Sequence, residues 1–382
     1  MTRVKISAEL FRWASERSGL SPEVLEESFP KLREWESEEL LPTLRQIESF
    51  ARKTRTPLGY LFLSKPPEEH LPIPLFRTVS TRQVNRPSPD LLETVQTMQQ
   101  RQDWMREHLT EENEDPLAFV GSVKVEDDPI VIAATIRSAL GLGRDWAARH
   151  QTWEDALRAF LHSIESTGVI VVANGVVGNN TFRKLDVTEF RGFVLTDDYA
   201  PLIFVNAADG KAAQMFTLAH EVAHVWFGHS AAFDLRELQP SNDIVEQACN
   251  KVAAEILIPA TELRATWNSI RDSNKRFQLV ARQFKVSSLV AARRTLDLSL
   301  ISKSEFLEFY RKYLSSEFTK RKSDGGDFYA TQNLRIGRRF AGAVVRAAKE
   351  GKLLYNEAYK LTGLHGKTYT QFAKTLLDRP AA

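Results

Sequence analysis

The chain has 382 residues, too many for one ordinary compact domain, so we expect two or three folding units. Hydrophobic residues make up 43% and charged residues 26%, near the averages for globular proteins, which excludes a disordered, collagen-like or fibrous chain. Lys and Arg number 51 and Asp and Glu 49, so the whole-chain charge predicts neither a general nucleic-acid binder nor an acidic shell. One cysteine, Cys249, excludes an intrachain disulfide, and no apolar run predicts a signal peptide or bilayer span; we expect a cytoplasmic protein without membrane association.

Residues 1–65 carry the pattern of a bundle of short helices. Ser21-Pro22 combines a capping hydroxyl with a proline that suits the first helical position. Thr43 and Gln46 form a capping box for a helix that runs to about Lys53. Five short helices over this length predict a bundle of the helix-turn-helix type.

The rest of the chain is expected to be helical around one small sheet. Residues 66–90 hold six prolines, which forbid long regular structure, and we take them as a linker. Residues 91–284 begin as a helical support and then carry three short β-branched or aromatic runs, which predict a small, mostly antiparallel sheet. Residues 285–382 form a helical C-terminal region, basic from about residue 319, so the fold class is α+β, mostly α. The three runs are residues 169–172, 190–195 and 202–205.

One motif carries a chemical signal: His220 and Glu221 are followed by His224 inside an apolar helix expected over residues 211–228. Two histidines four residues apart lie about 40° from each other around a helix, so both imidazoles can reach one metal ion. Glu221 lies about 100° further round, where a base can take a proton from metal-bound water. The alternative, a polar patch on a surface helix, is disfavoured because the neighbouring side chains leave almost no solvent-facing side.

A catalytic zinc needs three protein ligands, so one must come from outside this motif. Glu246 lies in the first turn of a second amphipathic helix, expected over residues 243–257, on a face of small residues that favours close packing. A solvated first-turn acid, stabilised by the helix dipole, explains Glu246 equally well from the sequence. The other candidate ligands are His229, Cys249, Asp234 and Glu237.

With these segments identified, the chain resembles the ImmA/IrrE family of metallo-endopeptidases. In that family the HExxH helix is followed by a helix with a glutamate four residues before an asparagine and an apolar stretch that ends in proline, here Glu246, Asn250 and Pro259. The resemblance implies a zincin-like protease domain, Glu246 as the third ligand, and Zn²⁺ as the cofactor, with Mn²⁺ as the alternative. His229 and Asn250 are then candidate contacts to the substrate or the transition state.

The resemblance also implies an activity, namely hydrolysis of a peptide bond by Glu221-assisted attack of zinc-bound water. The substrate would be a regulatory protein such as a transcriptional repressor, in a stress or phage response, aligned by strand addition at a sheet edge expected at Leu202–Asn206. The alternative is a non-catalytic regulator or antitoxin-like protein that uses the helix-turn-helix and the zinc fold to bind DNA or protein. Hydrolysis of a non-peptide bond is a third hypothesis.

The two ends of the chain differ in charge. The N-terminal part resembles a phage-repressor helix-turn-helix, with Lys31, Arg33 and Arg45 as candidate contacts to a partner or DNA. Residues 1–70 nevertheless hold 11 Lys or Arg against 12 Asp or Glu, whereas a reader of duplex DNA should be locally positive, so protein recognition is favoured over DNA. Residues 319–382 hold 13 against 5, which indicates either a solvated basic face or a surface for nucleic acid or an acidic partner.

Overall fold

The computed structural model describes residues 3–69, 87–233, 243–315 and 328–378, and none of the helices in these ranges is long and apolar enough to cross a membrane. The described residues divide into two compact units, with the boundary inside a long helix between Gln96 and Thr97. The prediction of an α+β, mostly α chain is confirmed. Three features predicted from the sequence lie outside the described residues. They are the candidate ligands Asp234 and Glu237, the Pro-rich stretch from residue 70 to 86 and the basic run at 320–322.

The N-terminal unit is a small helical bundle with its own aromatic core. Its capping box is confirmed, because Gln46 N donates to Thr43 Oγ1 and Thr43 N to the Gln46 side chain. Phe11 packs edge-on against Phe50 with ring centroids 5.2 Å apart, and Trp35 is buried beside them. The helices are α1 (Ala8–Ser18), α2 (Pro22–Ser28), α3 (Leu32–Glu36), α4 (Leu44–Lys53) and the 3-10 turn η1 (Leu58–Phe62).

The second unit contains a mixed four-stranded sheet in the order β1-β5-β4-β6. The pair β1 and β5 is parallel, and the pairs β5 with β4 and β4 with β6 are antiparallel, so the expected mostly antiparallel sheet is present with one parallel pair. The strands are β1 (Ile170–Asn174), β4 (Gly192–Leu195), β5 (Leu202–Asn206) and β6 (Ala231–Phe233), and β2 (Val176–Val177) pairs separately with β3 (Asn180–Lys184).

The sheet order corrects one expectation. Leu202–Asn206 was expected at an edge of the sheet, but β5 is hydrogen-bonded on both sides, to β1 and to β4. The physical reason is that the chain forms β4 before β5, and β5 then pairs with β1 on its other side. This long-range pairing cannot be read from the residues next to the zinc motif. Among the described strands, β6 forms the edge beside β4.

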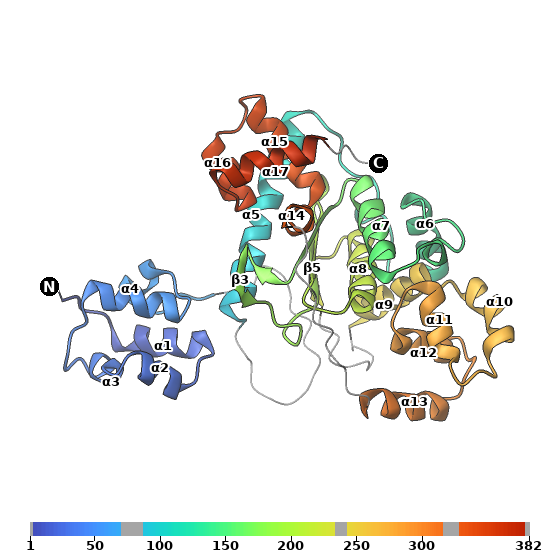
Figure 1. The fold of residues 1–382 in the computed structure, drawn as a ribbon, viewed down its shortest axis with the longest axis horizontal. Helices are drawn as coiled ribbons and strands as arrows, with labels where there is room; N and C mark the ends of the chain where they lie inside the picture. The colour runs from blue at the N-terminus through green and yellow to red at the C-terminus, as the bar shows by residue number, and fades with distance from the viewer. Residues whose placement is uncertain (1–2, 70–86, 234–242, 316–327, 379–382) are drawn as a thin grey trace. The chain divides into compact units, whose positions relative to one another are not determined.

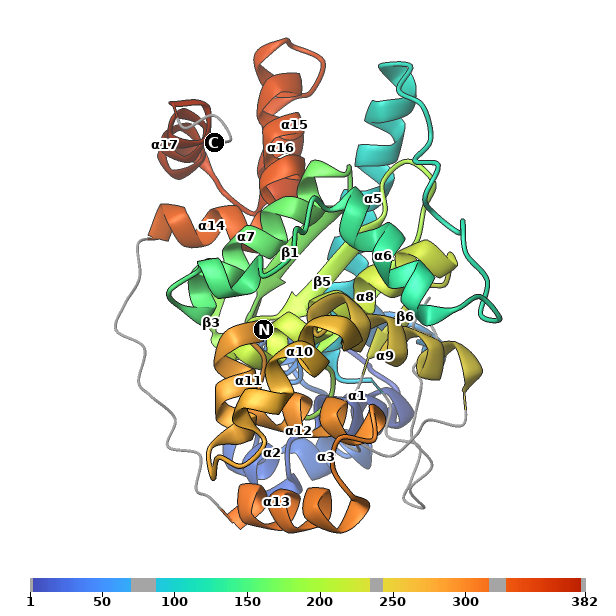
Figure 2. The ribbon, with the colours of Figure 1, turned by 90° about the vertical axis from the view of Figure 1, so that its right-hand side faces the viewer.

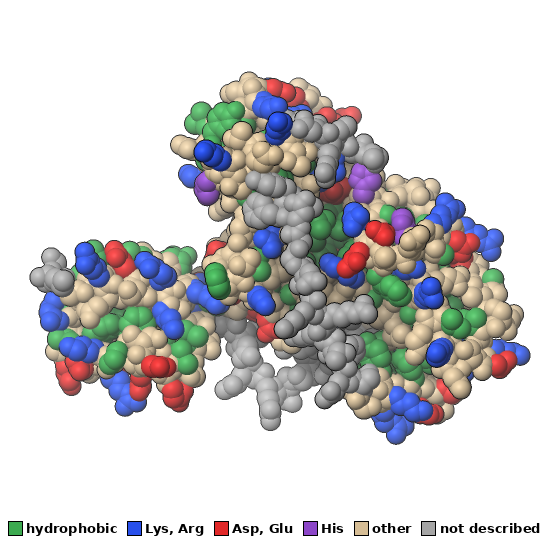
Figure 3. Space-filling view, in the orientation of Figure 1, with side chains coloured by type: hydrophobic (Ala, Val, Ile, Leu, Met, Phe, Trp, Pro, Cys, Tyr) green, Lys and Arg blue, Asp and Glu red, His purple; other side chains and the backbone are tan. Residues whose placement is uncertain are grey.

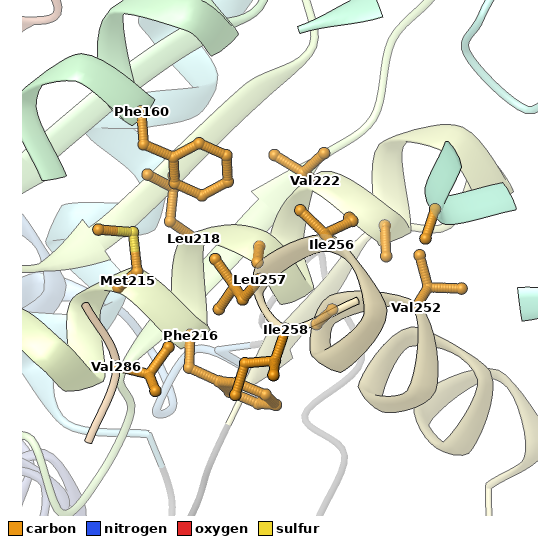
Figure 4. Close-up of a cluster of buried hydrophobic side chains, with 14 of the residues drawn as sticks. Phe160, Met215, Phe216, Leu218, Val222, Val252, Ile256, Leu257, Ile258 and Val286 are labelled. Carbon is orange, nitrogen blue, oxygen red and sulfur yellow. The ribbon is translucent and has the colours of Figure 1, made fainter. Parts of the chain in front are cut away.

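Helices pack against both the sheet and one another (Figures 1 and 2). In Figure 4, Leu218 and Val222 of α8 lie beside Ile256 and Leu257 of α9 in one apolar cluster. The helices of this part are α5 (Pro89–Glu111), α6 (Pro129–Ala139), the 3-10 turn η2 (Ala147–Arg149), α7 (Trp153–Ser166), α8 (Lys211–Phe227) and α9 (Ile244–Leu257).

Two further helical groups follow in the chain. The first group holds α9 in place, since Arg294 pairs with Glu255 and donates to the Ile258 carbonyl at 3.0 Å. Its helices are α10 (Ala260–Ile270), α11 (Arg276–Phe284), α12 (Ser288–Asp297) and α13 (Lys303–Ser315). The second group, at the red end of Figure 1, comprises α14 (Phe328–Ile336), α15 (Arg338–Lys349), α16 (Tyr355–Thr362) and α17 (Gly366–Asp378).

Candidate metal centre

The helix α8 is buried from Gln214 to Phe227, as expected for a segment that is apolar on all sides. It contacts β4 and β5 on one side and α7 and α9 on the others. Gly228 ends it in a left-handed conformation with φ of 73°, which glycine adopts at no steric cost. A helix this buried can hold charged side chains only where they find partners inside the protein.

Three ligand-type atoms converge where α8 meets α9. His220 Nε2 lies 3.2 Å from Glu246 Oε2, and His224 Nε2 lies 3.0 Å from Glu246 Oε1. The two Nε2 atoms are 3.0 Å apart. A tetrahedral zinc with bonds of about 2.0–2.2 Å separates its ligand atoms by about 3.3–3.6 Å. The two nitrogens and the Glu246 carboxylate, which offers a different oxygen to each of them, therefore lie close to the spacing of a three-ligand zinc site.

A hydrogen bond on the far side of His220 orients its ring toward the other two candidate ligands. Asn250 Oδ1 lies 3.1 Å from His220 Nδ1. An amide oxygen is an acceptor only, so Nδ1 carries the proton and the lone pair of His220 Nε2 points at His224 and Glu246. A nitrogen lone pair that faces a buried carboxylate needs a positive charge between the two groups, either a shared proton or a metal ion.

Glu221 lies beside this triangle without a protein partner. Both of its carboxylate oxygens are fully buried and accept no hydrogen bond in the structure. Burial, followed by the negative charge of Glu246, raises the pKa of Glu221 well above its usual value. An unpartnered buried carboxylate is costly, and a nearby positive ion would offset part of that cost.

The pKa shifts of the neighbouring ligands have the same origin. Burial lowers the pKa of His224, which favours the neutral imidazole that binds metals. Burial also acts against the charged form of Glu246, but its hydrogen bonds and charge interactions with the two histidines outweigh burial and lower the pKa of Glu246. An ionised Glu246 between the imidazoles of His220 and His224, with the partnerless oxygens of Glu221 beside it, fits a divalent metal ion.

Two features around α8 were not predicted as parts of the site. A Cβ atom on Gly192 of β4 would lie 2.6 Å from Thr217 Cγ2 and 3.1 Å from Glu221 Oε1, so only glycine lets β4 approach Glu221 this closely. The segment before α6 covers the end of α8, where Gly121 N donates to the Val225 carbonyl at 3.1 Å. Gly192 was recognisable in the sequence only as a strand residue, and nothing marked Gly121.

The structure places the remaining candidate ligands elsewhere. His229 is exposed just after α8, and its backbone N–H donates to the His224 carbonyl at 3.1 Å. Cys249 is buried on α9, and burial raises the pKa of its thiol, which makes it a poor thiolate ligand.

The candidate partner contacts lie in the N-terminal unit. Lys31, Arg33 and Arg45 are all exposed there, on or beside α3 and α4. Arg33 pairs with Glu26 at 2.7 Å, so part of its charge is already neutralised. The helix-turn-helix assignment of this unit stays a prediction.

Comparison with known protein families agrees with this geometry. The family model of the IrrE N-terminal-like domain, Peptidase M78, matches residues 179–296. These residues are similar to an IrrE N-terminal-like domain. The resemblance drawn from the sequence is thereby confirmed for this segment, and the matched range contains both histidines, Glu221 and Glu246. The IrrE N-terminal-like domain covers less than half of the 382-residue chain and is metallopeptidase-like.

A second family model, a domain of unknown function named DUF8813, matches residues 336–375. This range contains α15, α16 and most of α17, outside the IrrE N-terminal-like domain. No curated protein and no solved structure gives a significant match to the chain.

Proposed function

We propose that the IrrE N-terminal-like domain is a zinc-dependent endopeptidase, with His220, His224 and Glu246 as the metal ligands. The observation that carries this proposal is the buried group of His220, His224 and Glu246, whose nearest ligand atoms lie 3.0–3.2 Å apart in each pair, with the partnerless Glu221 beside it. Three protein ligands are the number that catalytic zinc sites use, whereas structural sites use four. Mn²⁺ is the alternative metal.

A bound metal at this site would supply a Lewis acid that polarises a carbonyl and lowers the pKa of a water molecule. Glu221 acts as the general base that takes the proton from the attacking water and then returns it to the leaving amine. Its oxygens have no protein hydrogen bond to break first. Asn250 acts behind His220 and orients the ring, so we assign it a positioning role instead of the substrate contact expected from the sequence.

The sheet offers a way to align an extended substrate. The strand β6 follows α8 within a few residues and forms the edge beside β4. None of the described strands pairs with its other side, where a substrate segment could be added as a strand. This edge replaces β5, which has no free side. We propose a protein substrate, cut at few sites, with a transcriptional regulator in a stress or phage response as the expected class and the cytoplasm as the place of action.

The test of this function is a search for new peptide ends. Purified full-length protein and the Glu221→Gln variant are incubated with proteins from the same cells and from neighbouring genes, and new N-termini are identified by mass spectrometry. The matched control is Glu154→Gln, an exposed glutamate of α7. We expect defined new termini with the wild type and Glu154→Gln and none with Glu221→Gln.

Two results would overturn the proposal. One is a wild type that produces no new termini although it contains metal, and the other is a Glu221→Gln variant that cleaves as the wild type does. The first result would make the domain a non-catalytic binding module, and a biological effect that survives Glu221→Gln would support that alternative. The second result would show that Glu221 is not the general base of the cleavage.

A further inference from the structure

The C-terminal helices contain a second helix pair with the geometry of a nucleic-acid reader. The helix α16 has 8 residues and α17 has 13, and three residues, Gly363 to His365, connect them. Gly363 has φ of 69°, and its N–H donates to the Tyr359 carbonyl at 2.8 Å, which ends α16 sharply. Two helices joined by a three- or four-residue turn with glycine are the helix-turn-helix arrangement.

Buried side chains hold this pair against its neighbours. Tyr369 of α17 packs edge-on against Tyr359 of α16, with ring centroids 5.1 Å apart. Leu364 in the turn and Phe372 of α17 are buried, and Phe340 of α15 is fully buried. In Figure 2, α17 is seen nearly end-on beside the upright ribbon that carries the α15 label.

The outer face of α17 carries side chains suited to DNA. Lys367, Thr370, Gln371 and Lys374 are exposed and follow the i, i+3, i+4, i+7 spacing of one helix face. Lysine neutralises phosphates, whereas threonine and glutamine can donate to and accept from base edges. Neither lysine forms an ion pair in the described part of the chain.

The surrounding charge distinguishes this face from an ordinary solvated helix. The matched range 336–375 holds eight Lys or Arg and two Glu, a net charge of +6. No acidic residue occurs between Glu357 and Asp378. By contrast, Lys312 of the solvated helix α13 pairs with Glu308 one turn away. Figure 3 shows Lys and Arg side chains on the visible surface of the C-terminal helices.

We propose that α16 and α17 form a helix-turn-helix that binds duplex DNA through the outer face of α17. Lys367 and Lys374 contact phosphates, and Thr370 and Gln371 face the base edges in the major groove. The proposal is independent of the metal centre. It gives the DNA-binding role to the positively charged end of the chain, whereas the N-terminal bundle has a net charge of −1 over residues 1–70.

The first test measures duplex binding by the full-length protein as a function of salt. The double variant Lys367→Gln with Lys374→Gln loses two phosphate contacts. The slope of log K against log salt should therefore fall in magnitude by about 2. The affinity at 0.1 M salt should fall by more than about tenfold. The control, Lys303→Gln with Lys312→Gln on α13, has the same charge change and should bind as the wild type. No duplex affinity, or an equal loss in both variants, would overturn the proposal.

The second test locates the contact and does not depend on a loss of binding. The native Cys249 is buried, so a cysteine introduced by Gln371→Cys can be labelled selectively with a photo-crosslinker. We expect a covalent adduct with duplex DNA from position 371 and none from a control label at Lys303→Cys. Absence of the adduct at 371 would overturn the DNA contact. Suppression of the adduct by poly-glutamate as effectively as by unlabelled duplex would show a surface for acidic proteins instead.

Discussion

The metal centre and the outer face of α17 are both groups of polar side chains suited to a charged ligand, but they differ in burial. His220, Glu221 and His224 are 0% exposed and Glu246 is 4% exposed, whereas Lys367 and Lys374 are exposed to solvent. Buried groups cannot use water as a partner, so a missing ion costs folding free energy. Exposed lysines stay hydrated, so they affect binding and not folding. We therefore predict a bound metal ion at the buried site and a ligand whose affinity depends on salt at the exposed face of α17.

Removal of the metal should give the largest difference between the two regions, because it lowers the stability of the fold whereas loss of the α17 lysines does not. A metal at about 1,000 times its Kd stabilises the fold by about 4 kcal/mol, which corresponds to a Tm change of roughly 10 °C for a domain of this size. We expect a chelator to lower the Tm of the wild type by this order, measured by calorimetry. The Lys367→Gln and Lys374→Gln variant should show the same Tm as the wild type before chelation and the same loss after it. A chelator without effect on Tm would contradict the difference between the regions.

Gly192 tests how tightly the metal centre is packed. In Gly192→Ala the new Cβ would meet Thr217 Cγ2 at 2.6 Å and the Phe204 carbonyl oxygen at 2.9 Å, so β4 or α8 must shift. We expect a loss of about 2–3 kcal/mol in the free energy of unfolding and reduced turnover, because Glu221 is displaced. The control is Gly143→Ala, where no atom lies within 4 Å of the new Cβ. Equal stability of the two variants in urea titrations would show that β4 does not constrain Glu221.

Asn250 tests the proton assignment at His220. Asn250→Ala removes the acceptor for His220 Nδ1, and loss of such a supporting hydrogen bond costs about 10–100-fold in metal affinity. Asn250→Asp keeps an acceptor and should restore most of that affinity, as measured by competition with a chelating dye. If Asn250→Ala binds metal as tightly as the wild type, the positioning role is wrong.

The smallest expected effect is on the pH dependence of stability, through Glu165 of α7, which accepts a hydrogen bond from the start of α15. Burial raises the pKa of Glu165 to about 7, although the backbone N–H of Arg339 donates to it at 3.1 Å. The unfolded chain therefore loses this proton at lower pH than the folded one, so the stability from Glu165 is greatest below about pH 4.5 and falls as the pH rises to about 7. We expect Glu165→Gln to remove a decline of about 1–3 kcal/mol between pH 5 and pH 8 in urea unfolding. An unchanged pH dependence would contradict the burial of an ionisable group there.

The features predicted from the sequence are those fixed by short-range spacing. The capping box of Thr43 and Gln46 and the pairing of His220 with His224 each lie within about one turn of one helix, so helix geometry alone determines them. The approach of Glu246 needed the family resemblance, because 22 residues separate it from His224 and the intervening loop leaves the direction of α9 open.

The features that the sequence did not predict depend on long-range packing. The central position of β5 follows from pairing with β1, about 30 residues earlier, and with β4. Asn250 was expected at the substrate and lies behind His220, because the rotation of α9 about its axis decides which side of the imidazole it meets. Gly192 acquires its role only from the closeness of β4 to α8.

The most direct test of the account is the metal content of purified full-length protein after dialysis, determined by plasma mass spectrometry. We predict one divalent ion per chain in the wild type and in Glu221→Gln, and a large loss in His220→Ala and Glu246→Ala. A wild type without stoichiometric metal, or a Glu246→Ala variant that retains the full amount, would contradict the proposed centre.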